Sequence, residues 1–263
     1  MQYEIRAMSF AEILDTALRL VTNHFVLFVG LFALMNVPMG LVTDYLTPDL
    51  PQPGDDVAAA EAVDLVNSGI AMVLASVTML SVLYPIALAA TTHAIAEQYR
   101  GRDIGFGEAL QYALSHIWPM MGTWLLATII ITLGFLALII PGIYLGLSLA
   151  LVWPVMVIEK AYGMQTIRRS RALMSGNFLR AFGIFFVAAL IGAVLGAGAQ
   201  IVLGQVPVVK LIAVPLVQSV SAAYATAAQV VLYFDIRCRK EGFDIDHLAS
   251  LVEQQGGVAS FTR

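Results

Sequence analysis

The sequence is short of charged residues, and this shortage limits what the protein can be. Only 12% of its 263 residues are Asp, Glu, Lys or Arg, whereas 59% are hydrophobic. Soluble domains typically carry about 25% charged residues. A soluble fold of this length has too little interior to hide so much apolar surface, so lipid must surround much of the chain. The composition therefore predicts an integral membrane protein.

The sequence also has a single cysteine, no excess of positive charge and no metal-binding spacing of its histidines. Cys238 is the single cysteine, which excludes an intramolecular disulfide and a cysteine-rich metal site. The formal net charge of −4, without a basic stripe interleaved with aromatics, argues against nucleic-acid binding. The four histidines lack metal-ligand spacing, and no cofactor motif is present, so we expect neither metal nor cofactor. The start, "MQYEIRAMSFAEIL", has no signal-peptide pattern and is expected to be mature sequence.

Long uncharged runs are what the sequence has in their place. Residues 117–158 contain no charged residue in 42 positions, about twice the length that one membrane helix needs. Pro141 and Gly142 stand in the middle of this run, so we predict that they form the external turn of a helical hairpin. The same length rule gives six transmembrane helices, at about 24–46, 69–98, 118–139, 142–160, 180–203 and 209–235. The predicted fold class is an all-α, polytopic helical bundle.

The distribution of charge orients this bundle. With both termini in the cytoplasm, Lys210 is the only one of the 14 basic residues outside. The 46–68 connection carries five acids and no base, so we expect it to be external. The sequence therefore predicts a multi-pass protein of the bacterial cytoplasmic (inner) membrane with both termini inside.

A repeat organises the chain. "SFAEILDTAL" (9–18) matches "GFGEALQYAL" (105–114) at Phe, Glu, Leu, Ala and Leu positions, and "MQTIRRSRALMSGNF" (164–178) is a looser third copy. Their helical apolar spacing predicts short amphipathic helices in the cytoplasmic interface. Each returning helix carries a proline (Pro85, Pro154 or Pro215). We predict one membrane domain of three units, at about 1–100, 101–162 and 163–246, with a cytoplasmic tail at 247–263.

Three segments of the sequence carry a family resemblance. "IIPGIYLGLSLALVWPVMVIEKAYG", followed by "TIRRSRALMSGNF" and "VVLYFDIRCRKEGFDI", resembles the membrane domain attached to some glycerophosphoryl diester phosphodiesterases and related stand-alone bacterial membrane proteins. The resemblance implies a multi-helix inner-membrane fold and no established reaction. The catalytic barrel of the fused members has no room in this chain, which argues against an enzymatic activity.

A basic cluster is the first candidate site. It comprises Lys160, Arg168, Arg169, Arg171 and Arg180. Arginine forks match phosphates, and anionic headgroups attract bases beside a membrane, so the cluster is a candidate lipid-phosphate site. The alternative is that these bases only orient the protein and are solvated by headgroups.

Acids at the inner ends of the predicted helices form the second candidate. A carboxylate near the hydrocarbon boundary is costly unless it is paired. Glu97, Glu159 and Asp235 are expected either to pair structurally or to relay protons. The candidate partners are Arg100, Arg168 and Arg237, and a Glu159–arginine pair would hold the third short helix against the fourth span.

Polar and small residues of the last two spans form the third candidate. Gln218, Ser221 and Gln229 lie near one face of the sixth span, where they serve either interhelical hydrogen bonds or a solute path. Gly192 and Gly196 give a close-packing surface, within the bundle or in a homo-oligomer. A water-filled cavity lined by the three polar residues would favour transport.

These observations favour a non-enzymatic protein that binds or organises lipids, anionic ones in particular, or membrane-associated partners through its basic cytoplasmic face. A small-solute or ion transporter that uses the repeat interface is the alternative. A lipid-modifying enzyme ranks third, because paired carboxylates are present without a convincing catalytic set.

Overall fold

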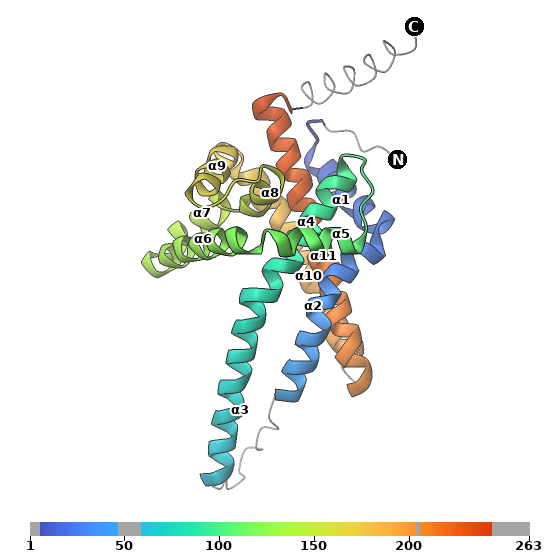
Figure 1. The fold of residues 1–263 in the computed structure, drawn as a ribbon, viewed down its shortest axis with the longest axis vertical. Helices are drawn as coiled ribbons and strands as arrows, with labels where there is room; N and C mark the ends of the chain where they lie inside the picture. The colour runs from blue at the N-terminus through green and yellow to red at the C-terminus, as the bar shows by residue number, and fades with distance from the viewer. Residues whose placement is uncertain (1–5, 47–58, 204–205, 244–263) are drawn as a thin grey trace.

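A computed structural model describes residues 6–46, 59–203 and 206–243 of the chain, and no strand occurs among them (Figure 1). Residues 47–58 of the predicted 46–68 connection lie outside these ranges, as does the 247–263 tail, whereas residues 59–68 are helical. The elements are α1 (Phe10–Asn23), α2 (Phe25–Leu46), α3 (Ala59–Thr78), the π-helix η1 (Met79–Leu83), α4 (Tyr84–Tyr99), α5 (Phe106–Ser115), α6 (Ile117–Ala137), α7 (Ile139–Ser148), α8 (Val152–Ile158), α9 (Met164–Met174), α10 (Phe178–Leu203) and α11 (Pro207–Glu241).

Five stretches of helix in the described part are long and apolar enough to cross a membrane. They are Phe25–Tyr45, Ile117–Ala137, Ile139–Ile158, Phe178–Leu203 and Val209–Glu241. The described part of the protein is therefore helical, with the composition of a membrane protein. The predicted span at 69–98 is not among the five, so a total of six spans stays a prediction, as does the direction of insertion.

Pro85 explains how the 69–98 segment is divided. A proline in a helix interior removes a backbone donor and pushes against the preceding turn. Here α3 widens into the π-helix η1, and α4 begins anew with Pro85 in its first turn, where no donor is needed. Most of α4 is buried in the protein, with Ala89, Ala90 and Ala94 fully covered.

A short helix precedes a long apolar helix three times, as α1–α2, α5–α6 and α9–α10. In α1 one face is buried through Ile13, Ala17 and Leu20, while Asp15 and Arg19 form an exposed ion pair. Ser9 and Glu12 cap the helix start reciprocally, which satisfies two otherwise free backbone donors. The order agrees with the predicted repeat, but the three-fold duplication stays a prediction.

The hairpin in the uncharged run turns at a different residue from the one predicted. Leu138 is extended (φ −168°, ψ 158°) and separates α6 from α7, so Pro141 lies in the first turn of α7 and not in the turn itself. Gly142 has a packing role, because a Cβ atom there would lie 2.9 Å from the backbone Cα of Phe135. The prediction of a hairpin was right, and its assignment of the turn to Pro141–Gly142 was wrong by three residues.

The returning arm of the hairpin is bent between α7 and α8. Pro154 has no N–H to donate to Ala150 O, four residues earlier. The Gln229 side-chain amide of α11 donates to this carbonyl instead. Ser170 of α9 donates to Ser148 O (2.9 Å) and accepts from Leu151 N (3.3 Å). The predicted single span at 142–160 is therefore two helices whose junction is held by side chains of α9 and α11.

The helices diverge from one end of the molecule (Figure 1). We call this the charged end; it contains α1, α5, α9, the C-terminal half of α4 and the C-terminal part of α11. From it α3 runs downward in the view, and the α6–α7 hairpin runs sideways across that direction. We call α3 and this hairpin the apolar arms. The core of the charged end includes Phe28, Ile95, Tyr99, Tyr233 and Phe234, all nearly inaccessible to solvent.

Candidate functional site

Asp235 joins three segments at the charged end. Its side chain is fully buried and accepts hydrogen bonds from Met8 N (2.7 Å) and from Arg239 Nε (3.1 and 3.2 Å). Arg180 Nε lies 3.2 Å from the other side of the carboxylate, and both arginines donate to Met8 O. The partners of Asp235 are therefore Arg180 and Arg239, and not Arg237. A buried carboxylate with this many donors fixes the chain start against α10 and α11.

Glu159 belongs to a closed ring of five polar side chains. Arg169 Nε donates to both of its oxygens (3.0 and 2.8 Å), and the Tyr233 hydroxyl donates to Oε1 (2.8 Å). Arg169 and Arg237 each donate to Glu241 (2.9 Å), and Arg237 also donates to the Tyr233 oxygen (3.3 Å). The hydrogen bonds to Glu241 and Glu159 raise the pKa of Arg169. We call these five residues the polar ring.

The polar ring fulfils one expectation and corrects its detail. An arginine of α9 does hold this short helix against the returning arm, but it is Arg169 and not Arg168. Glu97 pairs with Arg100 (3.3 Å), the partner that spacing suggested. These contacts support structural pairing of the acids, since each of the three carboxylates has at least one arginine partner.

The predicted basic cluster is split by the structure. Arg169 is in the polar ring and Arg180 contacts Asp235, so both are engaged within the protein. Lys160, Arg168 and Arg171 are exposed. None of these three has a hydrogen bond or ion pair with any described residue. The cluster therefore divides into two structural arginines and three cations that are open to a ligand.

The predicted polar face of the sixth span is also split. Gln229 contacts Ala150, and the Ser221 hydroxyl donates to Val217 O of its own helix (3.1 Å). Gln218 alone lines a cavity, of about 380 Å³, between α2, α10 and α11 at the end away from the charged end. Lys210 lies 3.7 Å from Asp44 in the same cavity. A continuous path along Gln218, Ser221 and Gln229 is therefore absent from the described residues.

The glycines proposed for close packing differ from each other. A Cβ at Gly192 would lie 3.5 Å from Ser221 of α11, so this position packs within the chain. Gly196 faces open space among the described residues. An oligomer through this surface stays a prediction.

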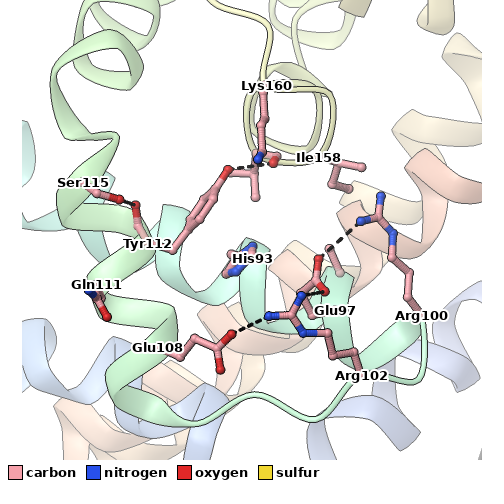
Figure 2. A pocket seen from close by; sticks show the side chains of 12 residues that line it. His93, Glu97, Arg100, Arg102, Glu108, Gln111, Tyr112, Ser115, Ile158 and Lys160 are labelled. Carbon is pink, nitrogen blue, oxygen red and sulfur yellow. Dashed lines mark hydrogen bonds and ion pairs between the residues drawn. The ribbon is translucent and has the colours of Figure 1, made fainter.

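A larger cavity, of about 470 Å³, opens at the charged end between α4, α5 and the end of α8 (Figure 2). Along one side a row of alternating charges runs from Arg100 through Glu97 and Arg102 to Glu108. Lys160 points in from the opposite side, as Figure 2 shows. We call this cavity the charged-end pocket.

Aromatic rings shape the wall of the charged-end pocket. Tyr112 stacks on His93 with ring centroids 3.8 Å apart, and His116 stacks on Tyr112 at 4.5 Å. The Tyr112 hydroxyl donates to Val157 O (2.8 Å), which ties α5 to the last turn of α8. His93 and Glu97, four residues apart on α4, both line this pocket, and no group of three potential metal ligands occurs among the described residues.

Two features of the charged end were not predicted from the sequence: the ion pair of Glu241 and the backbone conformation of Lys160. Glu241 lies four residues after Arg237, a spacing that indicates an ion pair on a helix, so the signal was available. Lys160 directly follows the C-cap of α8, a position where glycine is the usual residue, so its left-handed conformation was not predicted from the sequence. Its φ of 52° is the one positive value of a non-glycine residue in the described part of the chain.

The fold and these contacts define a class: a helical protein whose described residues include five helical stretches apolar enough to cross a membrane and a polar end held by ion pairs of the buried Asp235. The chain matches no family model, no curated protein and no solved structure. The resemblance to a phosphodiesterase membrane domain therefore stays a prediction.

Proposed function

We propose that this is a non-enzymatic bacterial inner-membrane protein that binds anionic lipid headgroups through α9. One observation carries the proposal: Arg168 and Arg171 are exposed and have no partner among the described residues, whereas Arg169 between them is engaged twice. A position three residues along a helix lies on the same face, so the two guanidinium groups point to the same side.

The chemistry of the two arginines suits a phosphate-rich surface. Each guanidinium can bind a phosphate with two parallel hydrogen bonds, and each base near an anionic leaflet contributes about 1 kcal/mol. The polar ring holds α9 in place, so binding does not have to order the helix first. This arrangement supports a role in binding or organising lipids.

A titration of the detergent-solubilised chain with short-chain phosphatidylglycerol tests the proposal. Neutralising both residues (Arg168→Gln with Arg171→Gln) should weaken binding about 30-fold, from about 2 kcal/mol lost. The matched control removes two exposed arginines that already have carboxylate partners, Arg6→Gln with Arg19→Gln. Phosphatidylcholine of equal chain length should bind both proteins weakly and equally. Unchanged affinity of the α9 variant for phosphatidylglycerol would contradict the proposal.

The cavity lined by Gln218 supports a second candidate, a small-solute transporter. Its opposed charges, Asp44 and Lys210, suit a zwitterion. Proteoliposomes exposed to an osmotic gradient of glycine should then swell, and Gln218→Leu should abolish the swelling. Equal swelling of protein-free liposomes would exclude this candidate.

A further inference from the structure

The charged-end pocket has an excess of one cation. Its two carboxylates, Glu97 and Glu108, each lie within ion-pair distance of an arginine, and Arg102 contacts both of them. The row of two acids and two arginines is therefore neutral as a whole. Lys160 adds a positive charge that no described residue neutralises. A ligand that completes the charge balance of this pocket is an anion.

The backbone presents Lys160 in a conformation that lysine seldom adopts. Its positive φ lies in the left-handed region, which residues other than glycine and asparagine seldom adopt. Lys160 directly follows Glu159, the C-cap of α8, and helices commonly end with one residue in this region. The polar ring holds Glu159 and the Tyr112 hydroxyl holds Val157, so the end of α8 that carries Lys160 is fixed in place.

The side chain of Lys160 extends from the end of α8 into the charged-end pocket (Figure 2). Arg100 approaches from the other side with a guanidinium that uses one nitrogen for Glu97. A phosphate group carries oxygens on several sides, so it can accept hydrogen bonds from both cations at once. The pocket, at about 470 Å³, is larger than a lone phosphate, and Val157 and Ile158 give it an apolar side.

We propose that the charged-end pocket binds a single phosphate group that belongs to a larger molecule, with Lys160 as its principal cationic partner and Arg100 as the second. The phosphate group is carried either by a lipid headgroup or by a small soluble phosphate ester. This site goes beyond the lipid surface of α9, because it consists of other side chains and faces α4 and α5.

Calorimetric titration of the full chain in uncharged detergent with inorganic phosphate tests the site. Lys160→Gly removes the cation and also accepts the positive φ, so it should melt at the same temperature as the parent or higher. It should bind phosphate at least about tenfold more weakly, since a charged hydrogen-bonding partner is lost. Lys160→Arg should restore binding to within about threefold of the parent.

Lys210→Gln is the matched control, because it removes one lysine charge at the other end of the molecule. It should leave phosphate binding unchanged. The site is refuted if Lys160→Gly binds phosphate as tightly as the parent, if acetate binds as tightly as phosphate, or if phosphate produces no binding heat and the retention of phosphatidylglycerol does not depend on Lys160.

Competition identifies the source of the phosphate group. We run it in the Arg168→Gln, Arg171→Gln background, which tests the pocket independently of the α9 surface. Displacement of phosphate by short-chain phosphatidylglycerol would assign the site to a lipid headgroup, and phosphate binding without displacement would assign it to a soluble ester. Loss of phosphatidylglycerol binding in this background with intact phosphate binding would support both proposals as separate sites.

Discussion

The charged end and the apolar arms are both helical, but different interactions hold them. At the charged end, α11 packs with α1 and α2, and its residues Val230, Val231 and Leu232 are fully buried. In the arms, Ile70 and Val73 of α3 are more than half exposed, as is Leu136 of the hairpin. The arms therefore depend on a surrounding apolar medium, whereas the charged end is stabilised by contacts within the protein.

A single helix, α11, passes through both regimes. Near its start Val209 and Ile212 are exposed, whereas Tyr233 and Phe234 near its end are inaccessible. The exposure of apolar side chains thus falls along one continuous helix, from its start to its end. We expect mutations at the charged end to lower the stability of the isolated protein most, and mutations in the arms to act more weakly.

The largest effect is expected for Asp235→Asn. It removes a fully buried carboxylate from two arginines while keeping the size of the side chain. Breaking such a pair by removing one partner costs about 3 kcal/mol. Chemical unfolding in mild detergent measures the loss. Asp15→Asn breaks an exposed pair with Arg19 and should change stability by less than about 0.5 kcal/mol. Both residues lie at the charged end, so equal effects of the two variants would show that burial of the Asp235 ion pairs does not increase their contribution to stability.

The second effect concerns the junction between α7 of the hairpin and α8, which a side chain of α11 holds. Gln229→Leu leaves Ala150 O without the donor that Pro154 fails to supply. Leaving this partly buried carbonyl unsatisfied costs about 2 kcal/mol. The same unfolding measurement applies, and Gln218→Leu, whose amide makes no hydrogen bond among the described residues, is the control. A loss at position 218 as large as the loss at 229 would contradict this assignment.

The third effect concerns the hairpin. Gly142→Ala would place a Cβ 2.5 Å from the Phe135 ring and should separate α6 from α7, at a cost of about 1–2 kcal/mol. Gly146→Ala, one turn further along α7, meets nothing within 4 Å and should add about 0.5 kcal/mol through helix propensity. Opposite shifts in melting temperature are expected. Shifts of the same sign would mean that the arm is loosely packed.

The smallest effect is a pH dependence at the start of α1. Hydrogen bonding to the Ser9 amide, together with Arg6, lowers the pKa of Glu12 from 4.5 to about 2. A lowered carboxyl pKa means that the cap is complete above about pH 4.5 and is lost as the pH falls toward 2. A nuclear magnetic resonance titration of the Glu12 carboxyl carbon measures this directly. A midpoint near 4.5 would show that the cap is open.

Composition predicted a membrane protein, because charge is scarce, and the length of the uncharged runs then predicted the helical class. The hairpin followed from the length of one uncharged run. Its turn could not be assigned to Leu138, because that position depends on which glycine lets the two helices approach, and Gly134, Gly142 and Gly146 read alike in a sequence. Close approach is a tertiary property.

The partners of the acids were predictable in kind and not in identity. Burial cost required that Glu159 be paired, and Arg168 and Arg169 were equally near in sequence. The rotation of α9 about its own axis decides between them, and it is set by burial of Ile167, Leu173 and Met174. The positive φ of Lys160 goes with its place directly after the C-cap of α8, so it depends on where that helix ends.

The single cysteine has a practical consequence. Cys238 lies in α11 between Asp235 and Arg239 and is 7% exposed, so a water-soluble thiol reagent can reach it only when this end opens. The rate at which the unmodified chain is labelled therefore measures local opening at that place without an introduced probe. Comparing this labelling rate with and without phosphate would show whether a ligand in the charged-end pocket slows the opening around Cys238.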